Sequence, residues 1–315
     1  MLKYIIKRLL MLIIAVAGCT FIIFMLMRLA PIDPPDPFRH AFPSVWHYHD
    51  HREHREWRKM HGLNDPVPIQ YLRYMARFFT GNFGSSFRSG VSITEEVMTR
   101  IPYTLRLSFA AFSFSVLLAV PIGVIAAVKR NTWVDRASIS IAFMGISMPL
   151  MWPGMFLVIF FSLRLGWLPS TGEAQLNSVI LPGMVLGYAM LFTIMLTARS
   201  SMLDIMGKDY IRTARAKGLS KGKIIFKHAL PNIIIPVLAS FKAHLGVFFT
   251  YIIITEYLFL RPGIGRLMMQ SIAVPDYRML LACLIVFILF FAFINFIVDI
   301  AKAFADPVMR RGRLC

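Results

Sequence analysis

Long apolar runs alternate with short basic segments along this chain, and the pattern predicts six membrane-spanning helices. A helix needs about 20 apolar residues to cross a hydrocarbon core of about 30 Å, and six runs are long enough. Prolines and glycines within them, as in AVPIGVIAAV, are expected to mark kinks and close helix contacts. The chain is therefore predicted to be an all-α polytopic membrane protein. The expected spans are residues 9–29, 104–128, 137–163, 179–198, 233–259 and 279–299.

The one sizeable stretch between spans, residues 31–103, is predicted to form a small helical segment outside the membrane. Its first part, APIDPPDPF, is proline-rich and extended. A charged helix, SVWHYHDHREHREWRKMHG, is expected to follow and to stop at Gly62. The next stretch, LNDPVPIQYLRYMARFF, has apolar residues at helical spacing, and TGNFGSSFRSG is expected to be a loop.

These spans divide the chain into segments. The apolar run of the first helix is too long for the core of a secretory signal, so an uncleaved span is expected. The predicted segments are an N-terminal transmembrane helix at 1–30, the extracytoplasmic helical segment at 31–103, a transmembrane core at 104–300 with a cytoplasmic loop at 199–232, and a tail at 301–315.

Lysine and arginine in the short flanks orient the predicted spans. Three lie before the first span, three between residues 129 and 136, eight between 199 and 227, and four from Lys302 to the end. Only four lie in the flanks on the other side. The long segment 30–103 is left out of this count because long loops cross largely regardless of charge. Both termini and the loop 199–232 are therefore predicted to be cytoplasmic, in a multi-pass protein of the inner membrane.

The composition agrees with a membrane protein and argues against two other classes. Hydrophobic residues make up 57% of the chain, mean hydropathy is +0.64, and 34 Lys and Arg stand against 16 Asp and Glu. The net charge of +18 would suggest nucleic acid in a soluble domain, but the charges lie mainly at the ends of the spans. No phosphate-binding loop, Gly-x-Ser-x-Gly elbow or His-Glu-x-x-His motif occurs, so no enzymatic activity is predicted. The three cysteines are too far apart to suggest a disulfide framework or a metal site.

Six of the eight histidines lie between residues 40 and 61. On a helix, His47, His51, His54 and His61 share one face, and a metal site built on two or three of them is geometrically possible, with His47, His51 and His54 as the candidates. The alternative is a solvated helix of mixed charge, which the neighbouring Arg and Glu residues favour.

Two ionisable residues, Lys242 and His244, lie inside the fifth predicted span. An ionisable group at that depth is costly unless it faces a cavity or a partner, so both are candidates for a translocation path. The alternative is that Lys242 extends toward the inner headgroups.

The basic stretch DYIRTARAKGLSKGKIIFKHALPN, within the loop 199–232, is predicted to form two short helices. Asp209 is the expected N-cap of the first helix and Gly218 its stop; Ser220 is expected to cap the second, which should end at Pro231. Ile211, Ala214 and Gly218 make a slim apolar face, which suits a helix that lies in a groove of another protein.

The same stretch resembles the cytoplasmic loop of ATP-binding-cassette importer permeases, whose pattern is Glu-Ala-Ala-x3-Gly-x9-Ile-x-Leu-Pro. The triplet falls on Arg212, Thr213 and Ala214, the glycine on Gly218, the isoleucine position on His228, and Leu-Pro on Leu230 and Pro231. The departures at Arg212, Thr213 and His228 are typical of the oligopeptide, dipeptide and nickel branch, in which DYIRTARAKGL and a following HAL recur.

The resemblance extends over nearly the whole chain. MLKYIIKRLL, GLNDPVPIQYLRYM, RIPYTLRLS, SMPLMWPGMFLV, EYLFLRPGIGRLMMQSI and NFIVDIAKAFADPVMR are similar to successive parts of that branch, in the same order. The His-rich run 40–61 departs from the pattern, and Lys242 and His244 stand where small or apolar residues are common.

The resemblance implies a type I ABC importer permease fold and a role as half of an importer channel. The implied partners are a second homologous permease, two cytoplasmic ATP-binding subunits and an extracytoplasmic substrate-binding protein, all at a lipid bilayer and without nucleic acid. The chain itself is expected to bind no cofactor, with ATP and magnesium on the partner subunits. Residues expected to couple it to the ATPase are Asp209, Arg212, Thr213, Ala214, Ala216, Gly218, Leu230 and Pro231. Residues expected to line the path are Ser147, Met148, Lys242 and His244.

Three functions remain open at this point. A permease for oligopeptides or dipeptides leads, and a permease for nickel or a metal chelate is its nearest alternative, supported only by the His-rich run. An ion-coupled secondary transporter would need intramembrane carboxylates, and the sequence offers only Glu256 and Asp299 near the boundaries. A receptor or scaffold is disfavoured because no predicted segment outside the membrane, apart from residues 31–103, is large enough to be a sensor domain.

Overall fold

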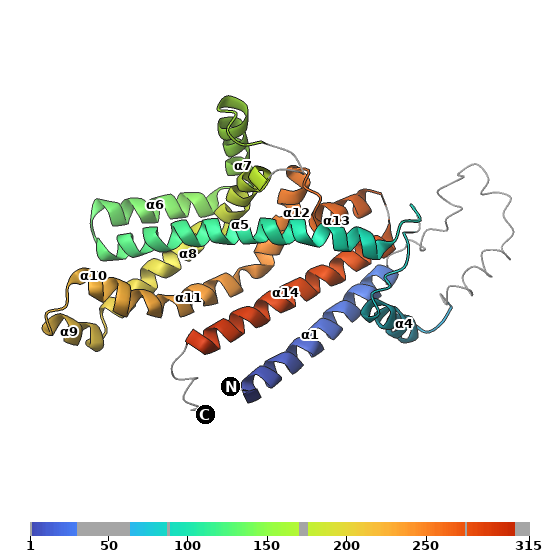
Figure 1. The fold of residues 1–315 in the computed structure, drawn as a ribbon, viewed down its shortest axis with the longest axis horizontal. Helices are drawn as coiled ribbons and strands as arrows, with labels where there is room; N and C mark the ends of the chain where they lie inside the picture. Colours follow the sequence, from blue (N-terminus) through green and yellow to red (C-terminus); the bar gives the residue numbers. More distant parts are fainter. Residues whose placement is uncertain (1, 30–63, 87–88, 170–175, 275, 306–315) are drawn as a thin grey trace. The chain divides into compact units, whose positions relative to one another are not determined.

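A computed structural model describes residues 2–29, 64–86, 89–169, 176–274 and 276–305. Within these ranges the regular elements are helices, and one isolated antiparallel bridge joins Ser85 to Ser92. The helices in chain order (Figure 1) are α1 Leu2–Leu29, α4 Val67–Phe79, α5 Ile93–Val128, α6 Trp133–Ser147, α7 Met151–Leu157, a π-helix Val158–Arg164, a 3-10 helix Leu176–Val179, α8 Ile180–Met206, α9 Asp209–Ala216, α10 Lys221–Lys223, a second π-helix Ile224–Ala229, α11 Leu230–Ala243, α12 Leu245–Leu258, α13 Ile264–Ala273 and α14 Tyr277–Ala305.

Four of the six expected spans are confirmed as single helices. Three lie within α1, α5 and α14, and the fourth lies within α8 except for Val179, which ends the preceding 3-10 helix. Helix α5 begins at Ile93, well before the expected start of its span. Glu95 and Glu96 lie in its first turn, where negative charge stabilises the positive end of the helix dipole. Large apolar side chains such as Leu117 of α5 and Phe293 of α14 are exposed along these helices, as expected for a surface that faces lipid.

The third expected span, 137–163, is a sharply bent pair of helices and not one continuous helix. Helix α6 and the α7–π pair meet at an angle of 106°. Pro149 explains the break, because a proline disfavours the helical conformation of the residue before it. Met148 is accordingly extended, with φ −80° and ψ 129°.

The fifth expected span, 233–259, is also not one helix. It consists of α11 and α12, which meet at His244 and point in different directions (Figure 1). The imidazole Nδ1 of His244 lies 2.9 Å from the carbonyl oxygen of Ser240, the oxygen to which the backbone N–H of His244 also donates at 3.2 Å. Competition for one carbonyl weakens the regular helical pattern at this residue.

The described chain forms two compact units. Unit 1 comprises residues 1–9, 104–261 and 293–315, and unit 2 comprises residues 10–103 and 262–292. In unit 2, helix α4 packs against α1 through the rings of Tyr71 and Tyr74, which lie against Phe21 and Phe24. Leu72 and Phe79, which the apolar spacing of α4 would also bury, are exposed. The Tyr71 hydroxyl lies 2.7 Å from the Thr20 hydroxyl, and the Phe78 and Phe83 rings stack with centroids 4.5 Å apart. The predicted helix in LNDPVPIQYLRYMARFF is thus confirmed, whereas the charged helix expected before Gly62 lies outside the described residues.

Helix α8 lies at the centre of unit 1, where it contacts α5, α6, α11 and α12. Small residues permit a close approach to α5. A β-carbon on Gly187 would lie 2.7 Å from the backbone oxygen of Ala111, and one on Gly123 would lie 2.5 Å from that of Met195. The Ser115 hydroxyl also donates to the carbonyl of Gly187 at 2.6 Å. The two backbones therefore touch, as small residues allow in membrane helices.

Replacing Gly187 with alanine should destabilise the protein, because its β-carbon has no room beside Ala111. Overpacking of this kind costs about 1–3 kcal/mol. The matched control is Gly246→Ala, since a β-carbon on Gly246 would meet nothing within 4 Å. Thermal unfolding in detergent measures both variants, and equal melting temperatures would contradict the close α5–α8 contact.

Candidate functional site

The loop after α8 is a compact structure in which the first short helix follows α8 almost directly. Only Gly207 and Lys208 separate α8 from α9. The expectation that Asp209 is the N-cap is wrong by one residue: Lys208 occupies the cap position, and Asp209 is the first helical residue. Its carboxylate remains well placed, because negative charge in the first turn favours the helix dipole.

A small apolar core holds α9 in place. The side chains of Ile211, Ala214 and Ile224 are buried against one another. Partly buried residues that pack around them are Ile205, Met206 and Leu219. The expectation that the face of Ile211 and Ala214 lies in the groove of another protein is therefore wrong, because the chain itself covers this face. The chain turns back after α9, so that Ile224 of the second π-helix covers Ile211 and Ala214.

Gly218 ends α9 as the sequence predicts. Its φ of +79° lies in the left-handed region, which side chains with a β-carbon disfavour. The N–H of Gly218 donates to Arg215, and the N–H of Leu219 donates to Ala214, so that the last carbonyls of the helix are satisfied. Ser220 then caps α10, as expected, with its hydroxyl 3.5 Å from the N–H of Lys223.

The second short helix does not end at Pro231, contrary to expectation. The π-helix Ile224–Ala229 leads directly into α11, and Pro231 lies in the first turn of α11. Because Pro231 has no N–H, one carbonyl of the preceding π-helix lacks the backbone donor that a continuous helix would supply. The amide of Asn232 donates to the His228 carbonyl at 2.6 Å and occupies a nearby backbone acceptor. The loop is therefore joined to a membrane helix on both sides.

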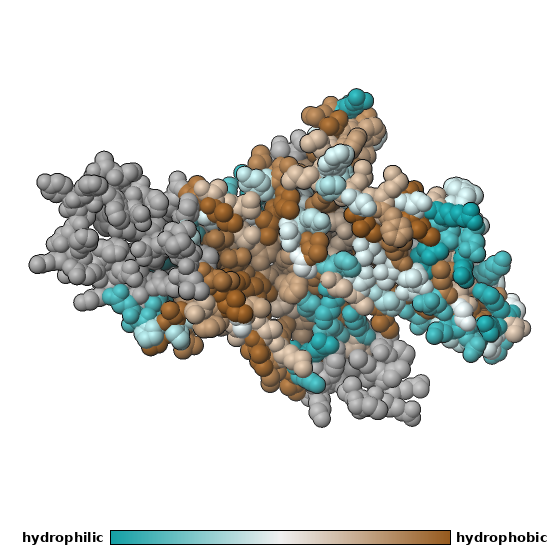
Figure 2. Space-filling view, turned by 180° about the vertical axis from the view of Figure 1, so that it is seen from behind, coloured by the Kyte–Doolittle hydropathy of each residue, from teal (hydrophilic) through white to brown (hydrophobic). Residues whose placement is uncertain are grey.

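The face of α9 that points outward is basic. Exposed residues on it are Tyr210, Arg212, Thr213, Arg215, Ala216 and Lys217. Figure 2 shows hydrophilic side chains gathered at the end of unit 1 that carries α9 and α10. Of the eight predicted coupling residues, only Ala214 is fully buried, and Leu230 is half-buried.

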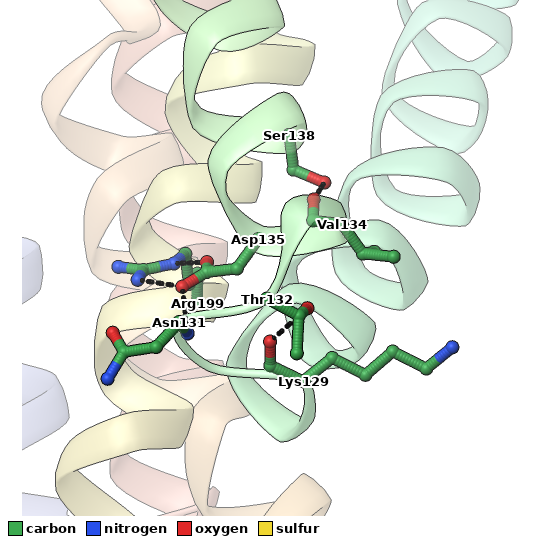
Figure 3. A network of polar contacts seen from close by, with 7 residues as sticks. All are labelled: Lys129, Asn131, Thr132, Val134, Asp135, Ser138 and Arg199. Atoms are coloured by element: carbon green, nitrogen blue, oxygen red, sulfur yellow. Dashed lines mark hydrogen bonds and ion pairs between the residues drawn. The ribbon is translucent and has the colours of Figure 1, made fainter.

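An ion pair between the half-buried Arg199 and the buried carboxylate of Asp135 joins α8 to the start of α6 (Figure 3). Arg199 donates to both carboxylate oxygens of Asp135, with Nε at 2.5 Å and Nη2 at 2.9 Å. The Asp135 carboxylate also accepts the N–H of Asn131 at 3.0 Å, and Asn131 has a left-handed φ of 64°. Paired contacts of this kind fix geometry as well as charge. In the sequence Arg199 reads only as one of the basic residues that flank a span, although Asp135, an acid at the head of an apolar run, was a signal that a partner is needed.

The four residues predicted to line the translocation path each have a hydrogen-bond partner in the structure. The ammonium of Lys242 donates to Asp299 on α14 at 2.5 Å, and His244 contacts its own helix at Ser240. The Ser147 hydroxyl donates to Phe143 in α6 at 2.8 Å. The Met148 sulfur lies 3.7 Å from the hydroxyl of Tyr188 on α8. Lys242 thus has an acidic partner on another helix, whereas the side chains of His244 and Ser147 bond to carbonyls of their own helices.

Buried acids elsewhere also have partners. The carboxylate of Glu256 accepts the Thr104 hydroxyl at 2.6 Å, and in unit 2 Asp276 accepts hydrogen bonds from Ser86 and from the N–H of Met279. Within the described residues no group of three or more His, Cys, Asp or Glu could hold a metal ion. The weak metal candidates His47, His51 and His54 lie outside the described residues.

Replacing Arg199 with methionine should leave the Asp135 carboxylate buried without its cation, and breaking such a pair costs about 3–5 kcal/mol. The double variant Asp135→Asn/Arg199→Met should recover part of this loss, because it removes the uncompensated charge and keeps an acceptor for Asn131. Arg136→Met is the matched control at an exposed position. Chemical unfolding in detergent gives the free energy of unfolding of all three variants. An Arg199→Met variant as stable as Arg136→Met would refute the importance of the ion pair.

Comparison with known proteins identifies the family. Residues 119–311 match the family described as binding-protein-dependent transport system inner membrane component, and residues 1–108 match the N-terminal family of the same systems. The chain is 36% identical over 310 residues to the glutathione transport system permease protein GsiC of Salmonella paratyphi A, covering 98% of this chain and 99% of that protein. The GsiC of Escherichia coli (strain K12) gives the same identity and coverage.

A solved structure shares the fold. A chain of the MetNI methionine ABC transporter in an inward-facing conformation superposes with a TM-score of 0.57 at 17% identity, covering 67% of this chain and 96% of that one. The fold is thus that of a type I importer permease, and members of the family are transport components of the inner membrane rather than enzymes. Such components work with ATPase and substrate-binding proteins. This chain belongs to the binding-protein-dependent transport system inner membrane components, as an ABC importer permease of the oligopeptide, dipeptide and nickel branch.

Proposed function

We propose that this chain forms half of the pathway of an importer for dipeptides or other short peptides, and that residues 199–232 couple it to the ATPase. The observation that carries the proposal is the full-length similarity to a glutathione transport permease, because glutathione is a tripeptide. Selectivity is expected to reside mainly in the binding protein, since a permease that passes varied cargo contacts it weakly.

The coupling role is supported by the way α9 is held. Its inner face packs on Ile224 of the second π-helix, which leads into α11, and only two residues separate α9 from α8. A force on its outer face therefore reaches two membrane helices without first unfolding the loop. The exposed Arg212, Ala216 and Lys217 belong to the surface that the ATPase would contact.

The partners follow from this role. A second homologous permease completes the pathway as a heterodimer, and two ATP-binding subunits carry ATP and magnesium, because this chain has no phosphate-binding loop. Both termini are cytoplasmic in this proposal, which rests on the excess of Lys and Arg in the flanks on that side.

Uptake by the reconstituted importer tests the function. Vesicles that contain this chain, its sister permease and the ATPase subunits should take up a labelled dipeptide or glutathione when its binding protein and ATP are supplied. A parallel experiment measures nickel uptake by the same vesicles. It compares the unchanged chain with a variant in which His47, His51 and His54 are replaced together. Metal uptake that depends on those histidines, without peptide uptake, would replace the peptide proposal with the metal alternative.

Gly218→Val should uncouple ATP hydrolysis from transport, because a β-branched side chain opposes the left-handed conformation that ends α9. The matched control is Gly222→Val, four residues away in the same loop, where φ is not positive and a β-carbon would meet nothing. We expect the Gly218 variant to lose most of the stimulation of ATPase activity by the loaded binding protein. Normal stimulation in Gly218→Val, equal to that of Gly222→Val, would rule out this role for the glycine.

A further inference from the structure

Helix α6 is attached to α8 at both of its ends. Where α6 begins, Arg199 donates to both carboxylate oxygens of Asp135 (Figure 3). Where α6 ends, the hydroxyl of Tyr188 donates to the carbonyl of Gly145 at 3.0 Å, and a β-carbon on Gly145 would overlap the ring of Phe192. The two attachments lie about 15 Å apart along α6, at a rise of 1.5 Å per residue. Helix α6 therefore cannot slide or pivot on α8 without breaking one of them.

The Asp135 carboxylate is also held from a second side. It accepts the N–H of Asn131 at 3.0 Å, from the short turn between α5 and α6. In the same turn the hydroxyl of Thr132 donates to the carbonyl of Lys129 at 2.6 Å. Asp135 is 2% exposed, so its side chain has no room to turn toward solvent. A carboxylate that accepts from three donors at once is fixed in direction, and the ion pair with Arg199 is a rigid joint.

This joint lies on the part of α8 that leads into the loop. Arg199 precedes the end of α8 at Met206 by about two turns, and only two residues separate that end from α9. At the far end of α6 are Ser147 and Met148, two of the residues predicted to line the translocation path. A displacement of α9 that moves α8 would therefore reach these residues through α6, since packed elements shift as units.

We propose that Asp135 is a positioning residue for the coupling of ATP hydrolysis to transport, because its ion pair with Arg199 makes α6 move with α8. Asp135 lies outside the loop 199–232, and the proposal rests on the coupling role given to that loop under the proposed function. Neutralising the buried charge would need only one cation near the carboxylate. The paired contacts of a guanidinium also fix the angle between the two side chains, which a point charge does not.

Arg199→Lys separates these two roles, because lysine keeps the positive charge and loses the paired contacts. Spin labels on Phe143 in α6 and Asp204 in α8, both exposed, report the position of one helix relative to the other. Double electron–electron resonance in the assembled importer, with the native cysteines replaced, should give the same distance distribution for the unchanged chain without nucleotide and with ATP bound. In Arg199→Lys the distribution should shift or broaden when ATP binds. The matched control is Arg136→Lys, at the exposed position next to Asp135.

Transport per ATP hydrolysed is the second readout. Arg199→Lys should lower the uptake of a labelled dipeptide per ATP about fivefold, since residues that carry coupling between two sites change it by about 2- to 30-fold. A loss of stability alone would lower uptake and ATP hydrolysis together and leave their ratio unchanged. Arg136→Lys should keep the ratio of the unchanged chain.

A distance distribution in Arg199→Lys that ATP leaves unchanged would overturn the proposal, because a single cation would then hold α6 as well as the paired contacts do. A distribution in the unchanged chain that shifts on ATP binding would also overturn it, since α6 would move independently of α8. The spin-label distances do not depend on the cargo. Distances as expected, in an importer that takes up no peptide, would leave this proposal standing while the proposed cargo fails.

Discussion

The close contact of α8 with its neighbours is the constraint on which the rest of unit 1 depends. Gly187 and Gly123 bring the backbones of α5 and α8 together, and the Arg199 to Asp135 pair fixes α8 to the start of α6. In a membrane, packing and satisfied polar groups hold helices together because lipid tails are as apolar as the side chains. A helix held in this way can transmit displacement, since packed contacts shift between discrete arrangements instead of deforming gradually.

The loop after α8 extends this rigidity out of the membrane. Ile211, Ala214 and Ile224 form a core of their own, so α9 is a fixed projection of α8 and α11 rather than a flexible connection. The small residues of α9 thus serve the loop's own packing, and its basic outer face is the surface open to a partner. Gly218 allows the inner face to be packed while the outer face stays exposed, because its left-handed conformation turns the chain back over the helix.

The sequence predicts the helices that extend over long apolar runs, and it misses the bends and contacts that depend on single residues. The spans in α1, α5, α8 and α14 follow from long apolar runs. The bend at Pro149 depends on how one proline is accommodated, and the separation of α11 from α12 depends on a side-chain contact of His244. The ion pairs of Asp135 and Asp299 join residues distant in sequence, and residue spacing along one chain does not reveal such contacts. The family, by contrast, was readable because its motifs lie in order along the chain.

The central claim is that the loop moves with α8 as one body when the ATPase binds ATP. Spin labels on Ser200 in α8 and on Lys217 beyond α9, both exposed, report this directly in the assembled importer after the native cysteines are replaced. Double electron–electron resonance should give the same distance distribution without nucleotide and with ATP bound. A shift of that distribution on ATP binding would show that α9 hinges against α8, and would contradict the account.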